Sequence, residues 1–184
     1  MAGIASKSQL RMSFLRYALF TVPGLLLLGT LSGALSGAGN GNPWFAGLHK
    51  PPLMPPGWVF GAAWTFLYIL LGLSLAMVLH ARGAKSRRSA TGLFAVQLAL
   101  NLAWSPLFFA FHKVGIALSL IAAMIVLCVA MVFVIWRIRI VAALLLYPYL
   151  GWLMFASVLN YQIMTLNPNA EALAPAGPST DIPL

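Results

Sequence analysis

The chain has 184 residues, of which 61% are hydrophobic and 7% charged, and its mean hydropathy is +0.93. A soluble domain is about 25% charged, so this composition excludes an ordinary soluble domain and indicates a protein whose main solvent is lipid. The length suits one helical bundle without a second domain. The sequence therefore predicts an all-α integral membrane protein.

The formal net charge of +9 reflects a shortage of acids, since Glu171 and Asp181 are the only two. The Lys and Arg residues stand in short clusters between apolar runs, which is typical of membrane proteins and not of a nucleic-acid-binding face. We therefore expect the lipid bilayer, and no nucleic acid, as a partner. The single Cys128 provides no disulfide framework and no thiol metal site, and we expect no metal.

Five apolar stretches are long enough to cross the hydrocarbon core, which takes about 20 residues of helix. They lie at about 14–36, 57–80, 91–111, 114–136 and 140–163. Residues 1–13 precede them as an N-terminal cytoplasmic segment. A cleaved signal peptide is an alternative for the first stretch, but the apolar part of a signal peptide is usually only about 7–15 residues long.

The connections between the spans differ in character. A Gly-Asn-Gly-Asn-Pro run at 39–43 and four prolines between 51 and 56 predict a structured loop before the second span. Beyond the membrane domain at 14–165 the sequence is rich in Ala and Pro without a core-forming pattern. We therefore expect residues 166–184 to be a disordered tail.

The basic residues predict the orientation, because Lys and Arg collect in cytoplasmic loops. With five spans, all but two of the basic residues fall on the same side. That side carries Lys7, Arg11, Arg16, Arg82, Lys85, Arg87, Arg88, Arg137 and Arg139, and the other side carries Lys50 and Lys113. The sequence predicts a cytoplasmic N-terminus and an external C-terminus.

Ionisable residues inside a membrane span usually mark a functional pathway, and none stands near the middle of these five spans. His49, His80 and His112 lie at span boundaries or in loops. Proton relays, intramembrane metal sites and a catalytic dyad or triad therefore lack their parts. This inventory argues against an enzyme without excluding one.

Three tryptophans stand where tryptophans are unusual. Trp and Tyr normally collect at the membrane surface, as expected of Trp44 and Trp58, but Trp64, Trp104 and Trp152 lie well inside their spans. An indole N–H in hydrocarbon needs a neighbour or a ligand as its partner.

Helical spacing groups these tryptophans with amides, phenols and glycines on three faces that should turn inward. The second span offers Gly57, Gly61, Trp64, Tyr68 and Gly72; the third offers Gln97, Asn101, Trp104 or Ser105, and Phe108; the fifth offers Tyr149, Trp152, Ala156 and Asn160. Such faces can line a central ligand cavity. They can equally hold helices together by hydrogen bonds between the amides, and spacing alone leaves both interpretations open.

Two further features concern the helix backbone. Pro106 should kink the third span and free a carbonyl near residue 102. Gly29, Gly33 and Gly37 form a ridge of small residues on the first span, which permits close helix approach either within the bundle or between protomers.

Three segments taken together resemble the TspO/MBR family, the translocator proteins, in a bacterial-type form. The first runs from Trp44-Phe45-Ala46-Gly47-Leu48-His49-Lys50-Pro51 through Pro55-Pro56-Gly57-Trp58 to Ala63-Trp64-Thr65-Phe66-Leu67-Tyr68. The second runs from Gln97 to Asn101 and on through Trp104-Ser105-Pro106-Leu107-Phe108-Phe109, and the third from Pro148-Tyr149-Leu150-Gly151-Trp152 to Ala156-Ser157-Val158-Leu159-Asn160-Tyr161. The resemblance covers about residues 14–165.

The resemblance implies a five-helix bundle that binds porphyrins and synthetic apolar ligands in a cavity. It places Trp58, Asn101, Trp104, Phe108, Trp152 and Ala156 on the cavity wall, and a lid loop with Trp44, His49, Lys50 and Leu53 over it. It also matches Trp64 and Trp152 to tryptophans implicated in light-dependent porphyrin breakdown. A homodimer in the bacterial inner membrane is implied too, with the outer membrane as an alternative.

Two departures from the family pattern bear on the ligand. Leu53 stands where the first loop usually carries a tryptophan, which weakens stacking of a tetrapyrrole under the lid. The cholesterol motif of the last helix needs a basic residue soon after Tyr161, and none occurs from Gln162 to Leu166. Cholesterol is therefore a doubtful ligand.

These observations favour a membrane protein that binds porphyrins or other tetrapyrroles and regulates or moves them, with protoporphyrin IX as a ligand and no cofactor. The alternative is an enzyme that degrades protoporphyrin with light and oxygen, using Trp64 and Trp152. A third hypothesis is a structural partner protein whose cavity is incidental.

Overall fold

The computed structural model describes residues 7–173, and within that range every regular element is a helix. The long helices are α1 (Lys7–Leu35), α3 (Gly57–His80), α4 (Arg87–Ser105), α5 (Val114–Trp136) and α7 (Tyr147–Leu166). Short helices α2 (Pro43–Gly47), η1 (Pro106–Ala110) and α6 (Ile140–Leu144) stand in or beside the connections. Five segments are long and apolar enough to cross a membrane, which confirms the predicted five-helix bundle.

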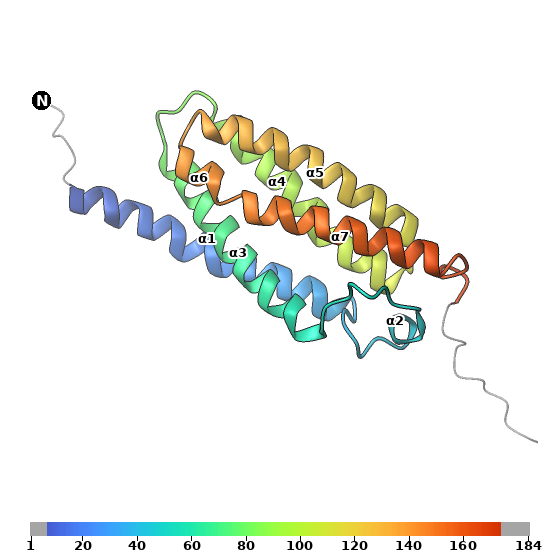
Figure 1. Ribbon diagram of the computed structural model, residues 1–184. Helices are drawn as coiled ribbons and strands as arrows, with labels where there is room; N and C mark the ends of the chain where they lie inside the picture. The colour runs from blue at the N-terminus through green and yellow to red at the C-terminus, as the bar shows by residue number, and fades with distance from the viewer. Residues whose placement is uncertain (1–6, 174–184) are drawn as a thin grey trace, which may run out of the picture.

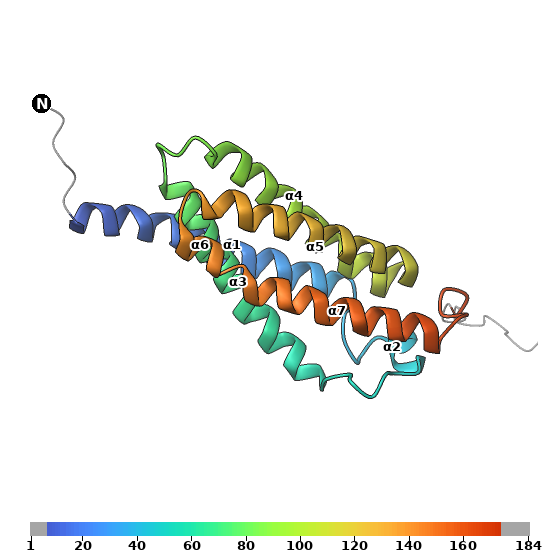
Figure 2. The same ribbon diagram turned by 45° about the horizontal axis from the view of Figure 1, so that its top comes forward.

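The five long helices run alongside one another and give the bundle two distinct ends (Figures 1 and 2). At one end α2 lies near the C-terminal end of α7, and we call this the lid end. At the other end α6 lies beside the connection between α3 and α4, which carries Arg82 and Lys85. We call this the basic end, and the first turns of α1 project beyond it (Figure 1).

The helices α1 and α3 approach closely because glycines stand at their contact. A Cβ added at Gly72 would lie 2.7 Å from the Cα of Val22, so no side chain fits there. Thr21 uses this proximity to donate a hydrogen bond to the Gly72 carbonyl at 2.7 Å. A Cβ on Gly29 would likewise collide with the Tyr68 ring, which shows that Gly29 serves approach within the bundle.

The third span changes its hydrogen bonding at Pro106, as the sequence predicts. The α-helix ends at Ser105 and a π-helical turn begins at Pro106. Because proline has no N–H, the carbonyl of Leu102 loses its partner within the helix. Ser32 of α1 donates to that carbonyl at 2.7 Å, so the freed group joins α1 to α4.

The last span differs from the continuous helix expected at 140–163. It begins with α6, is interrupted at Leu145 and Leu146, and resumes as α7. Pro148 near the start of α7 cannot donate to the carbonyl four residues earlier, which accounts for the break. Ser74 of α3 donates to the Ala142 carbonyl of α6 at 2.8 Å and ties this short helix to the bundle.

The expectation of a disordered tail from residue 166 is wrong for residues 166–173. Leu166 is the last residue of α7, and the turns that follow bury Asn167 and Ala170. These two residues contact the first loop through hydrogen bonds, a kind of contact that a composition rich in Ala and Pro does not reveal. Residues 174–184 lie outside the described range.

Candidate functional site

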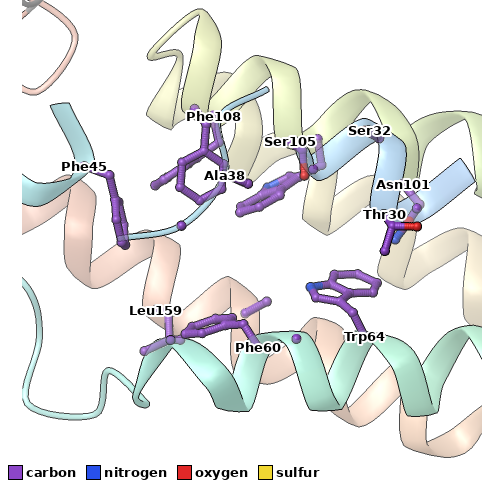
Figure 3. Close-up of a pocket in the computed structure, with 18 of the residues that line it drawn as sticks. Thr30, Ser32, Ala38, Phe45, Phe60, Trp64, Asn101, Ser105, Phe108 and Leu159 are labelled. Carbon is purple, nitrogen blue, oxygen red and sulfur yellow. The ribbon is translucent and has the colours of Figure 1, made fainter. Parts of the chain in front are cut away.

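A cavity of about 510 Å³ lies between α1, α3, α4, η1 and α7, toward the lid end of the bundle. Sites for small molecules and cofactors typically measure about 300–1,000 Å³ and combine apolar walls with a few polar groups. Figure 3 shows Trp64 and Phe60 of α3 on one side, Phe108 of η1 on the other, and Phe45 of α2 toward the lid. The central cavity predicted from the sequence is therefore present.

Flat aromatic faces dominate the walls. Trp104 stacks on Phe108, with ring centroids 5.0 Å apart and planes inclined by 14°. On α3, across the cavity, Trp64 stacks on Tyr68 of the same helix, with ring centroids 5.3 Å apart. Parallel ring pairs of this kind offer planar surfaces to a planar ligand.

Beneath the cavity, four polar side chains form one hydrogen-bonded group. Tyr68 donates to Asn101 Oδ1 at 2.7 Å, and the Tyr149 hydroxyl accepts from Asn101 Nδ2 at 3.1 Å and from Gln97 Nε2 at 2.8 Å. We call these residues the amide–tyrosine network. It joins α3, α4 and α7, so Gln97 and Asn101 do act as links between helices. Tyr68 and Asn101 also line the cavity, whereas Gln97 and Tyr149 lie below it.

Asn160 behaves differently from the amides of the network. It lines the cavity and is only 2% exposed, yet neither its Nδ2 nor its Oδ1 has a hydrogen-bond partner among residues 7–173. The indole Nε1 of Trp104 is also buried without a partner in that range. The cavity wall thus holds polar atoms that the described part of the chain leaves unsatisfied.

Two predicted wall tryptophans do not line the cavity. Trp58 is 75% exposed, although Gly57 and Phe60 of the same helical turn line the cavity, so it lies on the other face of α3. Trp152 lies behind Trp64, with ring centroids 6.2 Å apart, and also contacts Phe60. Ala156, one turn along α7, does line the cavity.

The predicted lid residues hold the loop in place instead of touching the cavity. Trp44 is buried and stacks on His112, with the ring centroids 4.3 Å apart. Its Nε1–H donates a hydrogen bond to the Ala170 carbonyl at 2.9 Å. Lys50 donates to the Phe45 carbonyl at 3.0 Å, and Leu53 is exposed. The residues of this loop that reach the cavity are Ala38, Gly39, Asn40, Phe45, Met54 and Pro55.

The segment Asn167–Leu173, which we call the C-terminal strap, fastens the lid loop. Asn167 accepts from the His49 N–H at 2.8 Å and donates to the His49 carbonyl at 2.9 Å. Glu171 pairs with Lys113 at 3.4 Å and accepts from the Gly115 N–H at 3.3 Å. The strap therefore bridges the lid loop and the start of α5.

Sequence reasoning missed the contribution of α1. The residues of this helix that line the cavity are Leu26, Gly29, Thr30, Ser32 and Gly33. None is aromatic or an amide, so these side chains do not mark a ligand-facing surface in the sequence. The glycine ridge was the available signal, since Gly29 and Gly33 mark the face that turns toward α3 and the cavity.

The pattern of the TspO/MBR family matches residues 21–166 of the chain. The chain belongs to the TspO/MBR family. It is similar to the translocator protein of Bos taurus, with 40% identity over 148 residues that cover 76% of this chain and 86% of the relative.

Microbial proteins are similar to the chain to the same degree. The tryptophan-rich protein TspO of Archaeoglobus fulgidus is 41% identical over 125 residues, covering 67% of this chain and 80% of its own length. The tryptophan-rich sensory protein of Cereibacter sphaeroides is 36% identical over 126 residues, covering 68% and 78%. Because mammalian and microbial relatives are about equally similar, the bacterial-type assignment stays a prediction.

Proposed function

We propose that the cavity binds porphyrins and related tetrapyrroles, together with other flat apolar ligands, and that the protein regulates or translocates tetrapyrroles during stress. The observation that carries this proposal is the pair of facing aromatic stacks, Trp104 with Phe108 and Trp64 with Tyr68, in a cavity of about 510 Å³. A flat, largely apolar macrocycle matches such walls. The relative named a sensory protein supports a regulatory role.

The carboxylates of a porphyrin suit the lid end. Burial of a charge in an apolar site is costly, and the cavity wall holds no Lys or Arg among the described residues. His49 and Lys50 are exposed in the lid loop and supply positive or polar groups outside the apolar walls. We therefore propose that the macrocycle enters with its carboxylates toward the lid.

The distribution of basic residues supports a proposal for the orientation in the membrane. The basic end carries Arg82, Lys85, Arg137 and Arg139, whereas Lys50 and Lys113 lie at the lid end. By the positive-inside rule, we propose that the lid faces outward from the bacterial inner membrane and that the N-terminus is cytoplasmic. A homodimer is proposed from the family resemblance. A tag on Leu184 that reacts with impermeant reagent only in opened cells would contradict this orientation.

The test of ligand binding is a titration of purified protein with protoporphyrin IX in the dark, followed by tryptophan fluorescence. We expect saturable quenching, because Trp64 and Trp104 lie on the cavity wall. Heat-unfolded protein in the same detergent is the control for porphyrin that dissolves in micelles. Equal, non-saturable quenching in both samples would contradict the proposal.

A light-driven reaction is the second candidate. Trp64 lies on the cavity wall, and its ring meets that of Trp152 edge-on with the centroids 6.2 Å apart. If an excited porphyrin takes an electron from Trp64, the indole of Trp152 is close enough to replace that electron. Under this hypothesis, Trp152→Phe keeps dark binding and slows the loss of the Soret band under light and oxygen. Unchanged photobleaching in Trp152→Phe and in Trp64→Phe would exclude it.

A further inference from the structure

Asn160 is the one buried amide of residues 7–173 in which neither polar atom is hydrogen-bonded. Gln97 and Asn101 donate to the Tyr149 hydroxyl, and Asn167 binds both the N–H and the carbonyl of His49. An unpaired polar group in an apolar interior is unfavourable unless another partner supplies its hydrogen bonds. A ligand in the cavity, which Asn160 lines, is placed to be that partner.

The hydrogen-bonding groups of Asn160 are also uncommitted within residues 7–173, whereas those of Asn101 are used. Asn101 is held from both sides by Tyr68 and Tyr149, so its amide is committed to the network. No bond within the described chain fixes the amide plane of Asn160. Its donor and its acceptor are therefore both available to a molecule that fills the cavity.

The chemistry of a primary amide defines the matching ligand group. Its carbonyl accepts and its NH₂ donates, side by side in one plane. The complement is an N–H next to a C=O, as in a lactam or a cis-amide, and asparagine makes an analogous bidentate contact with adenine. A carboxylate satisfies only the donor and leaves Oδ1 unpaired.

We propose that Asn160 selects, among flat apolar ligands, those that carry a lactam or cis-amide edge. Asn160 Nδ2 donates to the ligand carbonyl and Oδ1 accepts from the ligand N–H, while the free Trp104 Nε1–H is available to a second acceptor. The inference rests on the proposed function, because it requires that the cavity take flat apolar molecules. It adds the polar group by which the cavity distinguishes them.

The test uses two planar probes that differ in one donor, phenanthridinone and N-methylphenanthridinone. Binding to the purified full chain is measured by equilibrium dialysis against protein-free micelles, which removes the difference in micelle partition. We expect the wild type to bind the N–H lactam about tenfold more tightly than the N-methyl form, a factor that lies within the range by which a good bidentate contact discriminates. The methyl group adds apolar area, so hydrophobic binding alone would favour N-methylphenanthridinone.

Variants assign the preference to Asn160. Asn160→Leu removes both polar atoms at similar volume, and we expect the preference for the N–H lactam to disappear, with an affinity ratio of about one or below. Asn160→Ala is the second variant and should give the same ratio if leucine does not fit. Gln162→Leu is the matched control, because Gln162 also has a buried, unpartnered oxygen on α7 but does not line the cavity; it should retain the wild-type ratio.

The outcomes separate this inference from the proposed function. Equal affinity of the wild type for the two probes, or a preference that survives in Asn160→Leu and Asn160→Ala, overturns the inference even if protoporphyrin IX binds. A preference that is lost only in the Asn160 variants supports it. If that result appears while protoporphyrin IX fails to bind, the inference stands and the tetrapyrrole assignment fails.

Discussion

The two ends of the bundle use the same kinds of residue in opposite ways. In the amide–tyrosine network the Tyr149 hydroxyl accepts hydrogen bonds from Gln97 and Asn101, and toward the basic end a Cβ added at Gly72 would lie 2.7 Å from the Cα of Val22. Toward the lid end, Asn160 and the Trp104 indole have no partners among residues 7–173, and a Cβ added at Gly61 would meet nothing within 4 Å. The comparison teaches that the neighbours of an amide or a glycine, and not its residue type, distinguish the packed interior from the cavity wall in this membrane protein.

The glycines provide the largest expected contrast between the two ends. Gly72→Ala places a Cβ 2.7 Å from the Val22 Cα, and overpacking of this kind costs about 1–3 kcal/mol. Gly61→Ala meets open space and should gain up to about 1 kcal/mol from helix propensity. Reversible unfolding in mixed micelles measures the free energy of unfolding of each variant. Equal stability of the two variants would contradict the difference in packing.

Loss of one hydroxyl from the network has the next largest effect. Tyr149→Phe leaves the donors of Gln97 and Asn101 without their acceptor. Hydrogen bonds between membrane helices are worth about 0.6 kcal/mol on average and up to about 1.7 kcal/mol, so we expect a loss of about 1–2 kcal/mol in the same unfolding assay. Tyr161→Phe, at an exposed position, is the control and should change nothing. A loss as large in Tyr161→Phe would show that the network is not the cause.

The C-terminal strap should govern ligand exchange more than stability. Asn167→Ala removes the bonds to the His49 N–H and carbonyl and loosens the lid loop, which keeps its bond from Trp44 to the Ala170 carbonyl. We expect protoporphyrin IX to dissociate several-fold faster, with about 1 kcal/mol of stability lost. Stopped-flow displacement measures the rate, and Asn169→Ala, an exposed neighbour, is the control. Dissociation at the wild-type rate in Asn167→Ala would mean that the strap does not close the cavity.

The ion pair of the strap has the smallest expected effect. Lys113 and Glu171 are each nearly half exposed, and exposed pairs contribute about 0–1 kcal/mol. Glu171→Gln should therefore lower stability by less than about 0.5 kcal/mol, and the difference should vanish in high salt. A large loss, or one that salt leaves unchanged, would contradict this assignment.

Much of the fold follows from local rules of sequence. Apolar length identifies the five spans, and the missing N–H of Pro106 leads to the free Leu102 carbonyl that Ser32 satisfies. Those rules concern one helix at a time. The break at Leu145 and Leu146 was missed although Pro148 follows it, because the apolar run continues through it.

The site was less predictable, because it depends on contacts between distant segments. Asn101 and Asn160 read alike in the sequence, and only the position of Tyr68 and Tyr149 separates them. Spacing placed Trp152 on the cavity face, whereas it lies behind Trp64. The partner of Trp44 at Ala170 is 126 residues away, which no local pattern reveals.

The central claim is that ligands bind in the cavity at the lid end, and two tryptophans test it most directly. Trp104 lines the cavity, whereas Trp58 is 75% exposed outside it, although the family resemblance places both on the wall. The measurement is the dark affinity for protoporphyrin IX, followed by the Soret band, in Trp104→Leu and Trp58→Leu. We expect Trp104→Leu to weaken binding about tenfold and Trp58→Leu to match the wild type. Weaker binding in Trp58→Leu with normal binding in Trp104→Leu would place the ligand elsewhere and contradict the account.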